Sequence, residues 1–508
     1  MSAERVEVLV LGGSLSAVAL TAILGKRGIK AALVDQGELA SRTIPELGFW
    51  DERSAAADLV LNEAGIAFEC RQKARRLEPL LQIVLPDERL ELPPERSGLL
   101  LELSRGLSRA TAAEMARALE ELDAVEQESA DFLAEVGELP PTGFFRRRRA
   151  EKAAERYPRA VRDMKKADAL SGDVGRILLG LLPFFTNLDV SPTAPVSAIR
   201  LARIAGRVLR GLVEYSGDRS PHLLLREIAE KTGTKIETTA TRRIELGGKL
   251  VQAALAKDGH EIHAELLVDA SADLSGLRTI SHKQRPKGLA ILLDDATPKG
   301  EVHGIEIELD RAVLPPPIGE NVVLMNGRRD PRPNPSGELE AEDRPIMLHL
   351  RPHATDPKRV RVIALHPVSR VAAQSEGLEH LERVMSARVE RVIPFLKEGR
   401  PKTSPLSPRG GRSLHPLFDP ELDTLAYISG VPARTPLKNV FIAGPSVLPG
   451  LGSEGEYLVV LDLADAIEGA LRKAVKRTPL SERLKSRSLA AQAIGAPQVT
   501  RSSTPPAT

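Results

Sequence analysis

The stretch from Val6 to Asp35 constrains the fold of this chain more than any other part of the sequence. An apolar run at residues 6–11 ends in Gly12, which opens a longer apolar run of helical type. Gly28 interrupts that run, and a second short apolar run then ends in Asp35. The order of strand, glycine turn, helix, strand and acid is the layout of a βαβ unit that binds a dinucleotide. The sequence therefore predicts an α/β fold with a parallel sheet.

The glycine turn of this unit departs from the usual G-x-G-x-x-G pattern. The three glycine positions fall on Gly12, Ser14 and Ala17, and a side chain at Ser14 crowds the place where a pyrophosphate would lie. The helix N-terminus and the hydroxyls of Ser14 and Ser16 still offer donors to an anion. Asp35, 23 residues after Gly12, is placed to bind a ribose hydroxyl. The alternative is a βαβ unit that only opens a sheet and binds nothing.

Composition limits the classes of protein to consider. The 508 residues predict two or more domains, and 42% hydrophobic with 28% charged residues fit a soluble globular protein. The single cysteine, Cys70, excludes an intramolecular disulfide, and we expect it to pack in the core rather than to react. No Cys and His cluster of metal-ligand spacing is present, and neither is a signal segment or a long apolar run. We therefore expect no metal site and a cytoplasmic protein.

Two consecutive segments carry opposite charge. Thr111 to Glu138 contains nine acids and one base, and Thr142 to Lys166 contains ten bases and three acids. We expect them to form two helices that pair as an antiparallel hairpin. The alternative is a foot made by Phe144–Arg149, two phenylalanines followed by four arginines, that contacts an anionic membrane surface peripherally. Nucleic acid is not expected, because no known reader motif accompanies the basic run.

The middle of the chain alternates helix and strand signals. Ile177–Phe185 is strongly apolar but too short to span a bilayer, so we expect a buried helix or a pocket wall rather than a membrane dip. One glycine pair, Gly247-Gly248, and one Asp-Gly step, Asp258-Gly259, separate three strand-like runs, as in hairpins. Expected helices are Ser197–Tyr215, Leu223–Lys231 and Leu378–Val392, and the expected strands are Lys235–Glu245, Leu250–Lys257 and Glu261–Val268.

The C-terminal part holds a second strand, loop and helix. Leu437–Gly444 reads as a buried strand, Val447–Gly455 as a glycine-dense loop and Tyr457–Lys473 as an amphipathic helix. Such a loop and helix N-terminus can meet an anion or a polar ring edge. The segment Arg472–Thr508 has eight bases and one acid and ends in Ser, Thr and Pro, which predicts a disordered tail.

Three blocks, taken in series, resemble one known family. They are VLVLGGSLSAVALTAILGKRGIKAALVD, HLLLREIAEKTGTKIETTATRRIELGGKLVQAALAKDGHEIHAELLVDASA and KNVFIAGPSVLPGLGSEGEYLVVLDLADAI. The chain resembles the FAD-dependent phytoene desaturase and amine oxidase superfamily, most closely its carotenoid desaturase and retinol saturase branch. The resemblance implies a Rossmann-like FAD/NAD(P)-binding domain, three-layered with a parallel sheet, and an inserted α+β substrate domain. The implied binding domain comprises residues 1–79, 216–287 and 421–475, the substrate domain with its helical cap residues 80–215 and 288–420, and the tail residues 476–508.

The same resemblance implies FAD as the cofactor and places residues around it. The turn would face the pyrophosphate, Asp35 the adenosine ribose and the backbone of Thr241 the adenine, while the C-terminal glycine loop would lie by the second phosphate, the ribityl chain and the flavin. The implied turn residues are Gly12, Gly13, Ser14, Leu15, Ser16 and Ala17, and the implied loop residues are Gly444, Gly450, Gly452, Glu454 and Gly455.

Three departures from the family pattern concern these places. Pro445 follows Gly444 and offers no N–H. The Gly-Gly-Arg motif expected after the second strand is missing, and Arg42 is a loose stand-in for it. Glu454 puts a carboxylate into the flavin-facing loop. Near the flavin it would disfavour the anionic reduced ring, and its alternative is a loop acid turned to solvent.

The resemblance implies hydride transfer between flavin and an apolar, polyene-like or lipid-like substrate. The substrate cavity would be formed by Leu80–Tyr215 and Gly288–Pro420, and the sequence identifies no acid–base pair. Two other functions stay open. A non-catalytic relative of the same fold would bind a lipid or protein partner, as GDP dissociation inhibitors do, and a structural subunit would have lost FAD.

Overall fold

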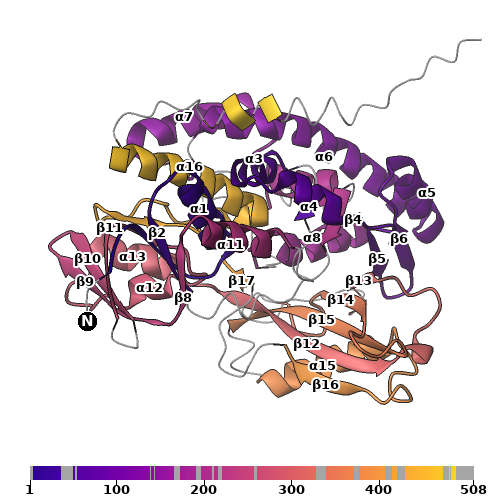
Figure 1. Cartoon of the computed structure of the whole chain (residues 1–508). Coiled ribbons are helices and arrows are strands. Elements are labelled where there is room, and N and C mark those ends of the chain that lie inside the picture. The colour runs from indigo at the N-terminus through magenta and orange to yellow at the C-terminus, as the bar shows by residue number, and fades with distance from the viewer. Residues whose placement is uncertain are drawn as a thin grey trace, which may run out of the picture.

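The computed structural model describes most of the chain. The described residues are 4–35, 50–51, 54–137, 139–141, 143–164, 172–189, 196–208, 211–215, 220–256, 260–325, 327, 339–370, 377–406, 415–419, 430–472, 480, 482–484 and 486–487. Arg42 lies outside them, and so does most of the predicted tail. The architecture is α/β, as predicted, with two large sheets and a layer of helices (Figure 1).

The first sheet is built from three segments that are distant in sequence. Its strands run in the order β8-β2-β1-β11-β10-β9, and β18 pairs with β11. The pairings among β8, β2, β1, β11 and β18 are parallel, whereas β9 and β10 form an antiparallel hairpin that continues from β11. The strands are β1 Glu4–Leu11, β2 Ala31–Asp35, β8 Lys235–Thr238, β9 Thr241–Gly247, β10 Leu250–Ala256, β11 Glu261–Asp269 and β18 Val440–Ile442.

Helix α1 (Leu15–Lys26) is the most deeply buried helix of this region. Ten of its residues are buried, because it packs against the sheet and three other helices, α3 (Ala55–Ala64), α11 (Pro221–Lys231) and α16 (Gly452–Arg472). In Figure 1 the yellow helix α16, from the C-terminal part, lies beside the indigo α1. The first and last parts of the chain therefore share one core.

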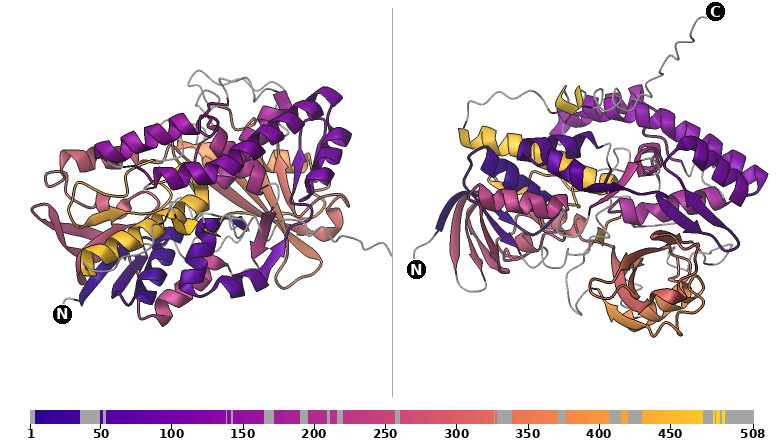
Figure 2. Two further views of the ribbon diagram at one scale, coloured as in Figure 1. Left: turned by 90° about the horizontal axis from the view of Figure 1, so that it is seen from above. Right: turned by 45° about the vertical axis from the view of Figure 1, so that its right-hand side comes forward.

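The second sheet curls into a barrel-like layer, seen end-on in Figure 2. Its strand order is β16-β12-β15-β14-β13-β5-β6, with β17 beside β12. Helix α15 (Leu378–Glu390) contributes Met385 and Val389 to a second hydrophobic core with these strands. The strands are β5 Leu81–Val84, β6 Arg89–Leu92, β12 Gly300–Asp310, β13 Asn321–Leu324, β14 Ile346–Pro352, β15 Arg359–Ser369, β16 Lys402–Pro405 and β17 Pro416–Leu417.

The oppositely charged segments form the predicted hairpin. Helix α6 (Arg109–Val136) packs along α7 (Gly143–Arg156), and both cross the top of the molecule in Figure 1. Ion pairs join the basic arm to the acidic helix at Arg156–Glu135 (2.7 Å) and Arg159–Glu128 (3.4 Å).

The remaining elements are α4 Ala67–Lys73, α5 Arg96–Gly106, α8 Gly172–Phe185, α9 Ala198–Arg203, α12 Ser275–Arg278, α13 Lys287–Asp295, β3 Trp50–Asp51, β4 Ala74–Arg76 and β7 Leu212–Tyr215.

Several expected elements are confirmed. Helix α8 covers Ile177–Phe185 and is largely buried, α15 covers most of the helix expected at residues 378–392, and the Gly247–Gly248 turn closes the β9–β10 hairpin. Cys70 is buried, in line with the expected packing role, and burial raises the pKa of its thiol to about 12, which disfavours the reactive thiolate. No helix in the described part of the chain is both long and apolar enough to cross a membrane.

Three expectations were wrong in their boundaries. The strand expected at 235–245 is two strands, because β8 must pair parallel with β2 whereas β9 must turn to pair antiparallel with β10. The helix expected at 197–215 is α9 followed by a π-helical turn and by β7, whose apolar residues pair with β3 and β4. The glycine-dense loop ends early, since α16 already begins at Gly452.

Candidate functional site

The glycine turn after β1 lies against the chain that follows β11. Gly12 has a φ of +107°, and a Cβ there would lie 2.5 Å from the backbone N of Ser271. Gly444, two residues after β18, also has a positive φ, and a Cβ there would lie 3.5 Å from the carbonyl oxygen of Ala270. The carboxyl ends of β1, β11 and β18 thus meet at one edge of the sheet, which is where ligands bind in open α/β folds.

Ser14 begins helix α1 as its N-cap. Its Oγ accepts a hydrogen bond from the N–H of Ala17 at 3.2 Å, and its φ and ψ are extended. Serine is among the residues that best cap a helix in this way, because its oxygen pairs one of the N–H groups that lack an intrahelical partner. The side chain that departs from the glycine pattern is therefore used to start the helix.

A second N–H of the first turn of α1 is bonded by a distant carboxylate. Glu456 Oε2, on the first turns of α16, accepts from the N–H of Ser16 at 3.0 Å and from its Oγ at 2.8 Å. Ser16 is fully buried, and Glu456 is only 7% exposed. The positive end of the helix dipole and these two donors favour a negative charge at this point. The anion found there belongs to this chain.

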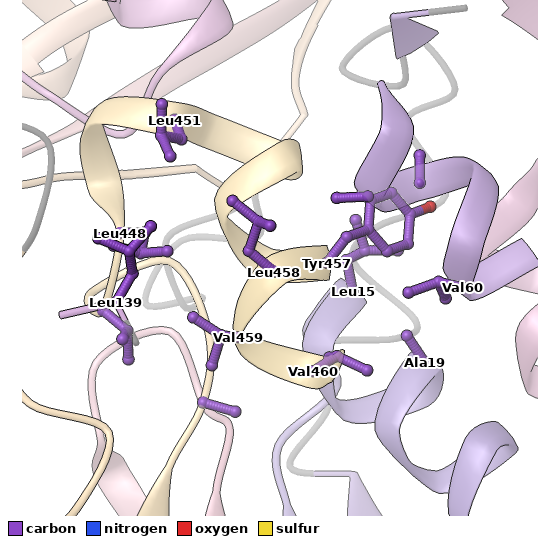
Figure 3. Packing of buried hydrophobic residues seen from close by; sticks show 14 of the residues in the cluster. Leu15, Ala19, Val60, Leu139, Leu448, Leu451, Tyr457, Leu458, Val459 and Val460 are labelled. Atoms are coloured by element: carbon purple, nitrogen blue, oxygen red, sulfur yellow. The ribbon is translucent and has the colours of Figure 1, made fainter. Parts of the chain in front are cut away.

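Two side chains from α16 and α11, one largely apolar and one polar, pack against the glycine turn and the start of α1. Tyr457, next to Glu456, is buried against Leu15 of α1 and Val60 of α3 (Figure 3). His222, at the start of α11, lies with Nε2 3.2 Å from the carbonyl oxygen of Gly13 and donates to it in the Nε2–H tautomer. All six predicted turn residues, Gly12 to Ala17, are buried.

The structure brings the predicted ribose and adenine residues close together. Asp35, 1% exposed, ends β2, and its carbonyl accepts a hydrogen bond from the N–H of Thr239 at 3.0 Å. Thr241, two residues later, begins β9 and is also buried. Asp35 ends its strand at the same end of the sheet as the glycine turn, and the backbone contact between Asp35 and Thr239 brings the start of β9 near it. Arg42, the loose stand-in for an arginine motif, lies outside the described residues.

The C-terminal glycine loop packs on helix α8. A Cβ at Gly452 would lie 2.4 Å from the carbonyl oxygen of Phe185, and one at Gly455 would lie 2.5 Å from that of Leu448. These two glycines therefore permit close backbone packing at the start of α16. Gly450 and Pro445 are buried in the same loop region.

Glu454 is neither turned to solvent nor isolated in this loop. Its Oε1 lies 3.3 Å from Nη1 of Arg203, at the end of α9, and Arg203 also lies 3.5 Å from Glu126 of α6. The side chain of Glu454 is 12% exposed. The solvent-facing alternative was therefore wrong: this carboxylate ties α16 to the helical layer.

Asp269 is a buried titratable group that the sequence reasoning missed. Burial raises the pKa of its carboxyl to about 6, against the opposing effect of hydrogen bonds from Ser271 and from the N–H of Leu277. It ends β11, beside the glycine turn. Its position after the run LLV was a usable signal, because a polar residue that ends a buried parallel strand lies at the ligand-binding edge.

Glu456 and His222 were also missed as members of this site. Both stand inside sequence blocks that were singled out, but each contacts the turn from a helix far away in sequence. The available signal for Glu456 was a charged residue between Gly455 and the apolar run that follows it. Such a pattern predicts an acid on a buried face of a helix, but it does not predict which residue the acid contacts.

Comparisons with known proteins place the fold. No family model and no curated protein matches the sequence. Among solved structures, a putrescine oxidase bound to putrescine is 15% identical over 92% of this chain and 99% of its own, with a TM-score of 0.57. A cyclohexylamine oxidase from Brevibacterium oxydans (14%, 92% and 99%, 0.55) and an oxidoreductase from Methanosarcina mazei (13%, 90% and 100%, 0.55) are also similar. The chain thus shares the fold of these oxidases along nearly its whole length.

This fold allows a test of whether the described residues fit FAD. The strand ends, the Gly12 turn and Asp35 lie at the edge of the sheet where folds of this type bind dinucleotides. At the N-terminus of α1, however, the N–H of Ser16 is bonded to Glu456. While that carboxylate is in place, the N–H of Ser16 is not available to a diphosphate, and two anions at this point would repel each other.

Proposed function

We propose that this chain is an FAD-dependent oxidoreductase that acts on an apolar substrate by hydride transfer, of the desaturase or saturase type. The observation that carries the proposal is the length of the shared fold. The structures of two amine oxidases are covered almost completely by this chain, over 92% of its own length. Hydride exchange is the chemistry that FAD carries when it is bound, and we assign an acid–base role to no described side chain.

The choice of an apolar substrate rests on the residues between the glycine loop and the second sheet. Helix α8 presents buried aliphatic side chains such as Ile177 and Leu181, and its Gly180 lies against Met325, next to β13. Putrescine and cyclohexylamine are the amines in the names of the similar oxidases. We propose an apolar, polyene-like or lipid-like substrate here because aliphatic surface recognises such molecules by burial and not by charge.

The absorbance spectrum of the purified protein tests this function. We expect a flavin spectrum near one FAD per chain, either as isolated or after incubation with excess FAD and desalting. Reduction of the bound flavin by dithionite, followed by its reoxidation, would establish that it is redox-active. A folded protein that stays colourless after this incubation contradicts the proposal.

The second candidate is a non-catalytic relative that binds a partner or serves as a structural subunit. The contact between Glu456 and Ser16 favours it, because a helix N-terminus already paired with a carboxylate does not need a cofactor to satisfy it. A colourless, folded and stable protein is the result that this candidate predicts.

We also propose that α7 contacts an anionic membrane surface. Phe144 and Phe145 at its start are 69% and 84% exposed, and Arg146–Arg149 follow them at the surface. The hairpin and the membrane foot are compatible, because Arg156, which pairs with Glu135 of α6, lies at the other end of α7 from the two phenylalanines. Arginines near anionic lipid add about 1 kcal/mol each, and exposed phenylalanines insert at the interface.

Sedimentation with vesicles tests the membrane contact. We expect the protein to bind phosphatidylcholine vesicles only when they contain phosphatidylserine, and the double substitution Phe144→Ser and Phe145→Ser to lower the bound fraction at least about threefold. Phe395→Ser is the matched control, since Phe395 is 62% exposed but lies beside the second sheet. Equal binding of the double variant and the native chain would show that α7 is not the contact.

A further inference from the structure

The carboxylate of Glu456 lies at the N-terminus of α1, the part of a dinucleotide-binding βαβ unit that faces a pyrophosphate. In a dinucleotide-binding βαβ unit the pyrophosphate lies at the N-terminus of the first helix, bonded by backbone N–H groups. Here Oε2 of Glu456 receives both the N–H and the Oγ–H of Ser16, at 3.0 and 2.8 Å. The N–H of Ala17 is bonded within the turn, by Ser14. Two first-turn donors of α1 are therefore in use.

We propose that Glu456 is an internal competitor for the diphosphate, and that FAD binds only when this side chain leaves the N-terminus of α1. The inference rests on the proposed function and concerns the same site. A carboxylate and a diphosphate repel each other strongly at contact distance in a buried place, and the N–H of Ser16 points at one acceptor in this geometry. Each anion therefore excludes the other.

The packing of α16 determines which part of it has to move. Tyr457, the next residue, is buried against α1 and α3 (Figure 3). Farther along the same helix, Glu468 lies 3.3 Å from Arg27 at the C-terminal end of α1, so the two helices are fixed to each other at both ends. The backbone of α16 is therefore held, and displacement is a rotation of the Glu456 side chain alone.

Substitutions at position 456 distinguish the effect of the negative charge of Glu456 from the effect of its side-chain volume. Glu456→Gln keeps the size and an oxygen that can accept from Ser16 but removes the charge, and Glu456→Ala removes both. The control is Glu468→Gln, which neutralises another buried carboxylate of α16 at the opposite end of α1. Affinity is measured by titration calorimetry with FAD and with ADP, a diphosphate that lacks the flavin. Melting temperatures are recorded with and without ADP.

We expect both variants at position 456 to bind FAD and ADP at least about tenfold more tightly than the native chain, which corresponds to about 1.4 kcal/mol. The Glu468→Gln control should bind as the native chain does. Without ligand Glu456→Ala should melt at a lower temperature, and ADP should raise its melting temperature more than that of the native chain. If Glu456→Ala does not fold, Glu456→Gln alone carries the comparison.

The outcomes distinguish this inference from the proposed function. If the native chain binds FAD as tightly as the variants, Glu456 is no competitor, and the oxidoreductase proposal stands. If only the variants bind FAD, the inference stands, and the native chain is the non-catalytic relative. If the folded native chain and the variants bind neither FAD nor ADP, both are overturned.

Discussion

At the scale of single residues, Asp269, at the carboxyl edge of the first sheet, makes the stability of the fold depend on pH. Its carboxyl is fully buried, and burial raises its pKa to about 6, against about 3.9 for an aspartate in an unfolded chain. Because the folded-state pKa is the higher one, the fold favours the protonated form. The stabilisation is complete below the unfolded pKa and is lost as the pH rises through about 6.

Asp269→Asn should remove this dependence, because asparagine has the same size and does not titrate. Between about pH 4.5 and about pH 7.5 we expect the free energy of unfolding of the native chain to fall by about 2 kcal/mol more than that of the variant. Urea unfolding at both pH values, followed by circular dichroism, measures the difference. Parallel pH profiles for the two proteins would show that Asp269 titrates alike in the folded and unfolded chain.

At the scale of elements, buried and exposed ion pairs hold different helices together. Arg27 ends α1 with its side chain 2% exposed and lies within 3.3 Å of three carboxylates, Glu63, Asp465 and Glu468. Arg156, in contrast, joins α7 to α6 from a side chain that is 65% exposed. Removing one partner from a buried ionic cluster leaves uncompensated charge, whereas an exposed pair is screened by water.

We therefore expect very different costs for the same substitution at the two arginines. Arg27→Met should lower the free energy of unfolding by about 3 kcal/mol, and Arg156→Met by less than about 1 kcal/mol. The two variants serve as controls for each other, because both exchange an arginine for a methionine at a helix end. Similar losses measured by urea unfolding would mean that burial does not govern these contacts.

At the scale of the whole molecule, the second sheet contributes to two cores. Val323, Met347 and Ile363 belong to the main cluster with α1, α16 and most helices, while the second cluster lies between the curled sheet and α15. A short segment of the predicted tail docks onto the first region: Arg483 pairs with Glu63 and Asp465. The expected disorder is therefore wrong for this segment, and for the tail residues outside the described part it stays a prediction.

The sequence predicted those parts of this architecture that depend on local patterns. The unit from Val6 to Asp35 forms β1, α1 and β2 as expected, because apolar period, a cap and a glycine turn all act over a few residues. The break between β8 and β9 could not be predicted, since each strand is fixed by a partner distant in sequence. The contact between Glu456 and Ser16 could not be predicted for the same reason, because it spans 440 positions. The sequence shows that residue 456 is an acid, but not which residue it contacts.

The pairing of α1 with α16 has a consequence for biosynthesis. Translation delivers the apolar α1 first and its partner α16 some 440 residues later, an interval of about 20 to 90 s at ordinary elongation rates of about 5–20 residues per second. During that interval the apolar helix α1 lacks α16, one of the helices that bury it in the folded protein. Nascent chains of this protein should therefore depend on chaperones that shield apolar segments at the ribosome until the final helix emerges.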